Sequence, residues 1–166
     1  MYKRQVEETV ETLSLMPTLL ELSGLPVADT VQGQSLLPLV ASPDNPAALG
    51  WIERPALTER KRIASRRERA PYDVDQYAVV SNDWKLVRNV DPPEGMAEFE
   101  LYNHTVDPLN HDDVATDHPD IVEQLKDALT SRLRYAEARQ LPNDEDETAG
   151  LSPEELQRLR SLGYIR

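Results

Sequence analysis

QYAVVSNDWKLVRNV, residues 76–90, is the stretch that decides the fold of this chain. It contains two runs, QYAVVSN (76–82) and WKLVRNV (84–90), whose length and content of β-branched and aromatic residues are typical of strands. Asn82 and Asp83 stand between the runs and suit a tight hairpin turn. The stretch therefore predicts a β-hairpin.

Two further runs extend this hairpin into a sheet. PALTER (55–60) precedes it, and EFELYNH (98–104) follows it after PPEG (92–95), which suits a longer turn. Pro119 to about Arg139 is predicted to be a helix because its apolar residues form one stripe at helical spacing. The stripe consists of Ile121, Leu125, Leu129, Leu133 and Ala136. We expect an α+β fold in which residues 51–140 form an antiparallel four-stranded sheet with this helix across one face.

The N-terminal region has a different pattern. LSLMPTLLELSGLPVADTVQGQSLLPLV, residues 13–40, predicts a helix, a sharp stop, a loop and a second short helix around residues 35–40. Ser14 is expected to cap the first helix through its hydroxyl, Pro17 suits the first turn, and Gly24 ends the helix. The unit is too short to bury its own apolar face, so its partner must lie elsewhere.

Two expectations follow for this N-terminal region. Val6 to Leu13, which alternates loosely, is expected to be a short strand. If the leucines pack on a sheet outside this sequence, they should be under-buried here. These leucines are Leu15, Leu19, Leu20, Leu36, Leu37 and Leu39.

The C-terminal residues predict a last, separate helix. An acidic linker, NDEDE (143–147), is followed by LSPEELQRLRSLGY (151–164). Ser152 and Glu155 form a capping box with Pro153 at the first helical position, and Leu151 can staple to Leu156. At the other end of the chain, MYKRQ (residues 1–5) matches what a sequencing adapter encodes in one reading frame. We interpret it as a scar ahead of Val6, with a natural polar start as the alternative.

Composition excludes several functions. The 166 residues are enough for one ordinary domain or a piece of a larger one. A net charge of −12 would repel a phosphate backbone, and no run of apolar residues is long enough to span a bilayer. We therefore expect neither nucleic acid nor a membrane as partner. The absence of cysteine excludes disulfides and thiolate metal sites.

Several segments resemble the sulfatase family in order and spacing over residues 6–165. They are PTLLELSGLP (17–26), QGQSLLPL (32–39), YAVVSNDWKLVRNV (77–90), FELYNHTVDPLNHDDVATDHPDIVEQL (99–125) and LSPEELQRLRSLGYI (151–165). The last is similar to the tail of many bacterial members. Ser14 and Asn103 stand where the family usually has Asp, and the segment 110–113 departs from the family pattern, so local loop geometry can differ there.

The resemblance implies how the chain is organised. Residues 6–50 would be the tail end of the large α/β sulfatase domain and would pack on its central sheet. Residues 51–140 would be the C-terminal subdomain, and residues 141–166 an acidic linker and terminal helix. The implied partner is the N-terminal catalytic domain of the same polypeptide.

The resemblance also implies that the chemistry lies outside this sequence. Sulfatases use a formylglycine made from Cys or Ser in Cys/Ser-x-Pro-x-Arg, and a calcium ion held by Asp and Asn oxygens. No such motif or ligand set matches residues 1–166, so we expect a C-terminal fragment with no catalytic residue and no metal site of its own. Two alternatives are another hydrolase of the alkaline phosphatase superfamily, such as a phosphodiesterase or phosphonate hydrolase, and a stand-alone interaction module.

Basic residues are the candidates for contact with a substrate. RKRIASRRER (60–69) is strongly basic in an acidic chain, and Lys85 begins a strand. Arginine pairs well with oxyanions, so this group could attract a sulfated small molecule or polysaccharide at the rim of a substrate cleft. The rim candidates are Arg60, Lys61, Arg62, Arg66, Arg67 and Lys85. The alternatives are a solvated loop and, for Lys85, a sheet lysine with its stem on apolar surface.

Three histidines recur at a spacing of seven among several aspartates. They are His104, His111 and His118. Imidazole and carboxylate together could hold a metal. We favour a solvated turn and loop, because Asp107-Pro108 is a turn starter within this segment.

Overall fold

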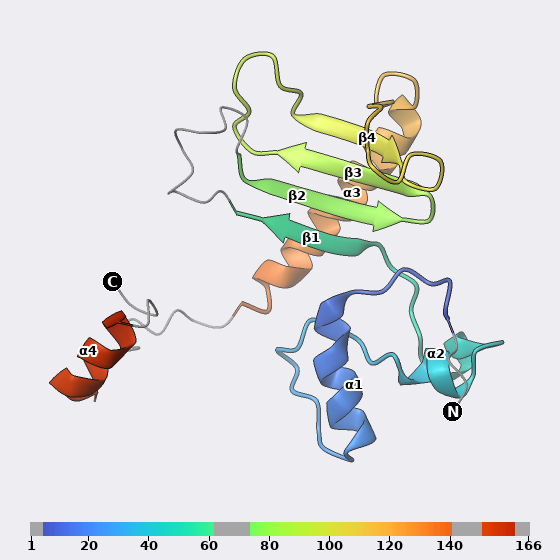
Figure 1. The fold of residues 1–166 in the computed structure, drawn as a ribbon. Coiled ribbons are helices and arrows are strands. Elements are labelled where there is room, and N and C mark those ends of the chain that lie inside the picture. The colour runs from blue at the N-terminus through green and yellow to red at the C-terminus, as the bar shows by residue number, and fades with distance from the viewer. Residues whose placement is uncertain (1–4, 62–73, 141–150, 162–166) are drawn as a thin grey trace.

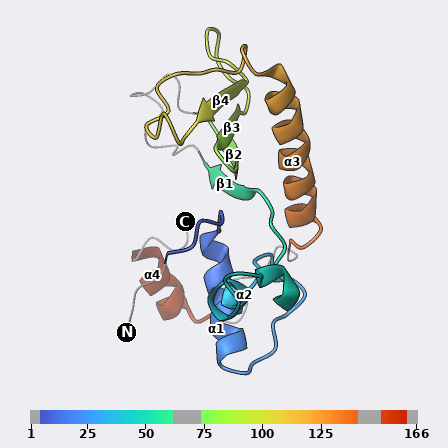
Figure 2. The same ribbon diagram turned by 90° about the vertical axis from the view of Figure 1, so that its right-hand side faces the viewer.

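The computed structural model describes residues 5–61, 74–140 and 151–161. Its main body is a four-stranded antiparallel sheet with one long helix, α3, across one face (Figures 1 and 2). The strands lie in sequence order and comprise β1 (Ala56–Arg60), β2 (Gln76–Ser81), β3 (Trp84–Asn89) and β4 (Phe99–Asn103). The predicted α+β fold of the sheet and helix is confirmed.

The β2–β3 turn follows from its residue types. Ser81 pairs with Trp84, which leaves Asn82 and Asp83 as a two-residue loop. Asn82 has φ 50°, a left-handed conformation that asparagine tolerates. A ring nitrogen of His104 lies 2.7 Å from the Asn82 carbonyl oxygen, so the loop after β4 supports this turn.

One face of the sheet and one stripe of α3 (Pro119–Glu137) form the core. Its centre is fully or almost fully buried and consists of Val79, Leu86, Leu101, Leu125 and Leu129. Because side chains alternate along a strand, the same face also carries Leu57, Tyr77, Trp84 and Phe99, which pack around this centre. The Trp84 ring lies 4.9 Å, centroid to centroid, from His118 at the start of α3. Trp84 is therefore a packing residue.

The N-terminal region lies on the β1 side of the sheet (Figures 1 and 2). Its elements are η1 (Thr12–Ser14), α1 (Leu15–Leu22), α2 (Leu37–Ala41) and η2 (Pro46–Leu49). Gly24, with φ 69°, ends α1: its N–H donates to Glu21 and the Leu25 N–H donates to Leu20, a Schellman motif. Gly33 packs so closely on η1 that a Cβ there would collide with the Leu13 carbonyl.

Two expectations for this region were wrong. Residues 6–11 form no strand in the described ranges, and the chain then turns into η1. Ser14 makes no side-chain cap. Its carbonyl instead accepts from the Thr18 hydroxyl at 2.6 Å, and the same hydroxyl accepts the Leu36 N–H at 2.8 Å. Thr18 therefore joins α1 to the start of α2.

The terminal helix α4 (Pro153–Ser161) begins as predicted. The Ser152 N–H donates to the Glu155 carboxylate at 2.8 Å, and the Glu155 N–H donates back to the Ser152 hydroxyl at 3.3 Å. No residue of α4 is buried. The acidic linker and most of the interpreted N-terminal scar lie outside the described residues, and the domain boundaries remain predictions. Within the described ranges, no helix is long and apolar enough to cross a membrane.

Candidate functional site

The N-terminal region carries an exposed apolar surface, which we call the leucine face. Leu15 is 57% exposed, Leu19 63% and Leu22 61%, in contrast to 3% for Leu125 in the core. The leucine face comprises Leu13, Leu15, Met16, Leu19, Leu22 and Leu25. Soluble proteins rarely leave so many neighbouring large apolar side chains in water unless the surface binds a partner.

The expected under-burial holds for part of the predicted set. Leu15 and Leu19 are exposed, whereas Leu20, Leu36 and Leu37 are half-buried. Leu39 is 2% exposed, so the expectation was wrong for this residue. The reason is local: α2 contacts both α1 and η2, and Leu39 lines a hollow together with Val6 and Pro43 of the same region.

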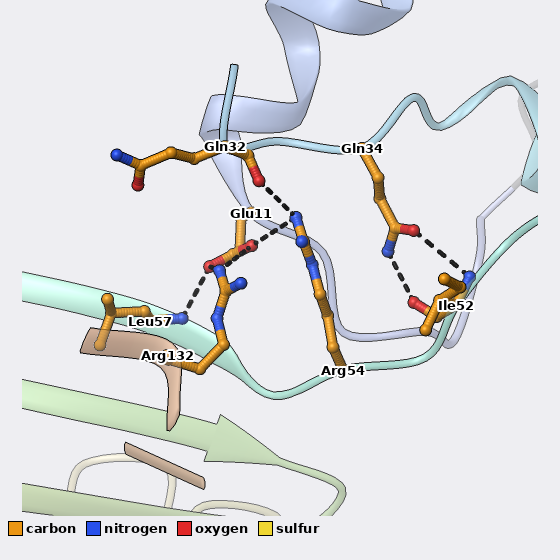
Figure 3. A network of polar contacts seen from close by, with 7 residues as sticks. All are labelled: Glu11, Gln32, Gln34, Ile52, Arg54, Leu57 and Arg132. Carbon is orange, nitrogen blue, oxygen red and sulfur yellow. Dashed lines mark hydrogen bonds and ion pairs between the residues drawn. The ribbon is translucent and has the colours of Figure 1, made fainter. Parts of the chain in front are cut away.

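A buried carboxylate joins the N-terminal region to the sheet and α3 (Figure 3). Glu11 is 8% exposed, and its Oε1 accepts the Leu57 N–H at 2.8 Å and the Arg132 guanidinium at 2.7 Å. Its Oε2 lies 2.9 Å from the same Arg132 nitrogen and 3.3 Å from the Arg54 guanidinium. One side chain therefore holds three segments: β1, α3 and the strand-like stretch before β1.

Further polar contacts widen this junction (Figure 3). The Arg54 guanidinium also donates to the Gln32 carbonyl at 3.0 Å, and the Gln32 amide reaches the Ala136 carbonyl at 3.4 Å. The Gln34 side chain binds the backbone of Ile52 twice, donating to its oxygen at 2.7 Å and accepting from its nitrogen at 3.3 Å. Residues 32–34 thus connect the N-terminal loop by hydrogen bonds to the segment that leads into β1.

No sequence pattern indicates the Glu11 junction, because Glu11 and Arg132 are 121 positions apart and neither belongs to a motif. The side chains of Glu11, Arg54 and Arg132 are 5%, 19% and 11% exposed. Removing one member of so buried a set strands a charge, which typically costs about 3–5 kcal/mol. The junction is therefore the principal polar connection between the two regions.

The rim candidates are divided between different environments. Arg60 and Lys85 line one hollow of about 310 Å³ on the sheet face opposite α3, which we call the open face. Its other lining residues are Thr58, Gln76, Ala78, Val80 and Val87. Arg62, Arg66 and Arg67 lie outside the described residues.

Lys61 is engaged elsewhere. Its ammonium lies 2.7 Å from the Glu59 carboxylate, 2.9 Å from the Tyr77 hydroxyl and 3.7 Å from the Asp75 carboxylate. The hydrogen bond to Glu59 and then that to Tyr77 hold the pKa of the Lys61 ammonium above its ordinary value. The Lys61 ammonium is therefore already paired with neighbouring side chains of the same chain, which makes it a weaker candidate for contact with a substrate.

A polar network occupies the β4 side of the open face. Asn89 is fully buried; its amide nitrogen donates to the Ala97 carbonyl at 2.7 Å and to Glu100 Oε1 at 3.2 Å, while its oxygen accepts from Gln76 at 2.6 Å. The Tyr102 hydroxyl donates to Glu100 Oε2 at 2.8 Å. Burial, and then this bond to Glu100, raise the pKa of the Tyr102 phenol. Both oxygens of Glu100 therefore have donors already.

The histidines do not converge on a metal site. His104 contacts the β2–β3 turn, the His118 ring packs at a tilt against Trp84, and His111 is exposed. Across the residues that the structure describes, no group of His, Cys, Asp and Glu is arranged to hold a metal ion.

The carboxylates of this segment instead shape the loop after β4. The Asp107 carboxylate accepts the N–H groups of His111 at 2.6 Å and Asp112 at 3.0 Å. The backbone hydrogen bond from Asp112 is the main cause that holds the pKa of Asp107 below its ordinary value. Asp113 likewise accepts from the Leu101 and Ala115 N–H groups. The preferred loop interpretation agrees with this arrangement.

Comparisons with known proteins support the relationship suggested by the sequence, although no family model matches. Rat arylsulfatase K is 24% identical over 131 residues, which are 79% of this chain and 22% of that protein. Human arylsulfatase K is 26% identical over 132 residues, 79% of this chain and 23% of that protein. The chain thus spans about a quarter of the length of these curated relatives.

Solved structures share the fold. The structure of BT4656 in complex with its substrate D-glucosamine-2-N,6-O-disulfate matches 81% of this chain and 25% of that chain, with a TM-score of 0.58 and 20% identity. The crystal structure of Ps i-CgsB matches 96% of this chain and 30% of that chain, with a TM-score of 0.55 and 20% identity.

The four-stranded antiparallel sheet with α3 across it, preceded by the leucine-rich helices, lies within the fold that this chain shares with these solved structures. The chain is accordingly similar, over about four fifths of its length, to part of an arylsulfatase. Among the proteins to which it is similar, arylsulfatase K of several vertebrates recurs.

Proposed function

We propose that this chain is the C-terminal portion of a sulfuric ester hydrolase, where it supports the catalytic domain and borders the substrate cleft. The observation that carries the proposal is the leucine face, which is exposed on a chain whose sheet and α3 have an ordinary closed core. A sulfatase catalytic domain would supply the missing apolar partner, since the relatives extend over about four times the matched length.

The exposed leucines favour a permanent contact between the leucine face and its partner. Burying a leucine side chain contributes about 1.5–3 kcal/mol, and several leucines on this face are more than half exposed. A helix as short as α1 is marginal without packing, so the docking partner would also stabilise the helix itself. The partner in this proposal is the N-terminal catalytic domain of the same polypeptide.

The reaction centre would belong to that catalytic domain. The sulfatase relationship implies formylglycine and calcium in the intact enzyme, and the residues described here do not fit either group. The chain contains no Cys and no Ser-x-Pro-x-Arg. We therefore expect this chain alone to hydrolyse no sulfate ester, as measured with an aryl sulfate; turnover abolished by a substitution within the chain would contradict the proposal.

The proposed substrate class is a sulfated carbohydrate. The structural neighbour BT4656 has a disulfated glucosamine as its substrate, and two basic residues of this chain share one hollow on the open face. We expect this hollow to border the substrate cleft of the assembled enzyme.

A binding experiment tests the docking. The genomic sequence upstream of Val6 should encode Cys/Ser-x-Pro-x-Arg in frame, and that upstream region, co-expressed as a separate chain, should co-purify with this one. Leu19→Asp should abolish the co-purification, whereas Val106→Asp, which alters an apolar residue 81% exposed on the loop after β4, should leave it intact. A natural stop codon upstream, or equal loss in both variants, would contradict the proposal.

A further inference from the structure

The hollow on the open face results from the register of three strands. Its middle row consists of Thr58, Ala78 and Val87, which pair across β1, β2 and β3 and have short side chains. The neighbouring rows carry longer ones, with Lys85 in one row and Arg60 and Gln76 in the other. A floor of short side chains, one of which carries a hydroxyl, is thus bordered by an amide and two cations.

Lys85 differs from the other lysines with described surroundings. Lys61 is paired with Glu59, and Lys126 is paired with Glu123 at 2.7 Å. The Lys85 side chain is half-buried, and its ammonium has no ion pair or hydrogen bond within the described ranges. In a chain of net charge −12, a half-buried cation without a carboxylate is unusual.

Among the described residues, Glu100 is a carboxylate on the same face as Lys85, and its oxygens are already engaged. Lys85 pairs across the strands with Tyr102, and Glu100 lies one row further along the open face. Glu100 already accepts from Tyr102 and from Asn89, one donor on each oxygen. The polar network therefore satisfies its own carboxylate, and within the described ranges no carboxylate pairs with the ammonium of Lys85.

We infer that the open face around Lys85 is an anion-binding subsite for a sulfate group of the carbohydrate, with Lys85 as the residue that contacts the sulfate. Thr58 and Gln76 border the same hollow and offer hydrogen bonds to sugar hydroxyls. The short middle row admits the body of a sugar ring. The inference rests on the proposed function for its substrate class, and it adds a binding site remote from the sulfur that reacts.

The chemistry explains why a sulfate suits this site. A sulfate ester has three acceptor oxygens and keeps its single charge at every physiological pH. A lysine ammonium is a compact charge with three donors, and charge-assisted hydrogen bonds are the stronger kind. A hollow with a partly apolar floor limits competition from water for that contact.

The test is a titration of the full 166-residue chain, followed by backbone amide NMR, with D-glucosamine-2-N,6-O-disulfate and, separately, with inorganic sulfate. We expect saturable shifts at Ala78, Val80, Lys85 and Val87 with the sugar. Lys85→Gln should weaken this binding about tenfold or more, which corresponds to one charge-assisted hydrogen bond, and Lys85→Arg should retain most of it. The matched control is Lys126→Gln, the same charge change on α3, which should leave the affinity unchanged.

Several outcomes would overturn the inference. These are shifts that do not saturate, equal weakening in the Lys85 and Lys126 variants, or equal binding of unsulfated glucosamine. Saturable shifts with inorganic sulfate alone, and none with the sugar, would leave an anion site but overturn the carbohydrate subsite. The result is independent of docking, because failed co-purification would refute the proposed function even where Lys85 binds the disulfated sugar.

Discussion

Residues 6–50 and residues 74–140 use leucine in opposite ways. In the second region, Leu86, Leu101 and Leu129 are at most 2% exposed because a sheet face and a helix stripe meet. In the first region, Leu15 and Leu19 are more than half exposed although their helix is equally regular. The difference is the presence of an apolar partner within the chain. The sheet with α3 is therefore a closed unit, whereas the N-terminal region leaves an apolar surface exposed.

The largest effect is expected at the contact between the two regions. Glu11→Gln leaves the buried guanidinium of Arg132 without a full negative partner. We therefore expect the free energy of opening of residues 6–50 to fall by about 3–5 kcal/mol. If that free energy is smaller than this loss, the region should open completely. Native-state hydrogen exchange would measure it. The sheet should change little. Adding Arg132→Met should recover part of the loss, and no recovery would mean that Glu11 acts other than by pairing this charge.

The same substitution at one leucine of each region measures the difference in burial directly. Leu129→Ala should lower the free energy of unfolding by about 2–5 kcal/mol, because it removes a core side chain that is 2% exposed. Leu19→Ala, the same chemical change at a site 63% exposed, should stay within about 0.5 kcal/mol. Urea denaturation of both variants provides the measurement. A loss below about 0.5 kcal/mol for Leu129 would place α3 off the sheet.

The difference between the two regions can also be tested in the unmodified chain. Residues 6–50 should exchange their amide protons far more readily than β2, β3 and α3, and the exposed leucine face should make the chain self-associate. Hydrogen exchange by region, together with the mass in solution by light scattering, tests both statements. Equal protection of the two regions in a monomer would show that the N-terminal region has a complete partner within this sequence.

The smallest effect is expected in acid, in the loop after β4. Because the folded-state pKa of Asp107 is lowered, its carboxylate contributes stability that is fully present above its unfolded value, near 3.8, and is lost as pH falls through the lower folded value. An NMR titration should show the Asp107 carboxyl titrating below 3.8, with the His111 amide losing protection in the same range. Asp107→Asn should remove this pH dependence. A titration at or above 3.8 would contradict the prediction.

Local patterns predicted most of the closed unit. The four strands and α3 were found because alternation, turn residues and a leucine stripe are properties of neighbouring positions. The expected strand at Val6 to Leu13 failed for the opposite reason, since a strand exists only where another backbone pairs with it. The predicted exposure of Leu39 was wrong because this residue is buried by other parts of the N-terminal region.

The candidate sites were less accessible to sequence reasoning. The basic run identified Arg60, and its place at the start of a strand identified Lys85, but their shared hollow depends on the register of β1, β2 and β3. Lys61 was indistinguishable from Arg60 until the structure placed it beside Glu59 and Tyr77. The Glu11 junction was missed altogether, because a contact across the chain leaves no trace in the spacing of residues.

The position of Glu11 has a consequence for cutting and recombining this protein. Composition suggests a border near residue 50, and an expression clone of the sheet unit would naturally start there. Such a clone would keep Arg54 and Arg132 but discard the carboxylate that neutralises them. A useful clone should therefore begin before Glu11 or replace Arg132. The same holds for recombination between homologous genes. A hybrid protein joined at this border should keep a stable sheet unit only when its N-terminal segment has an acidic residue at the position of Glu11.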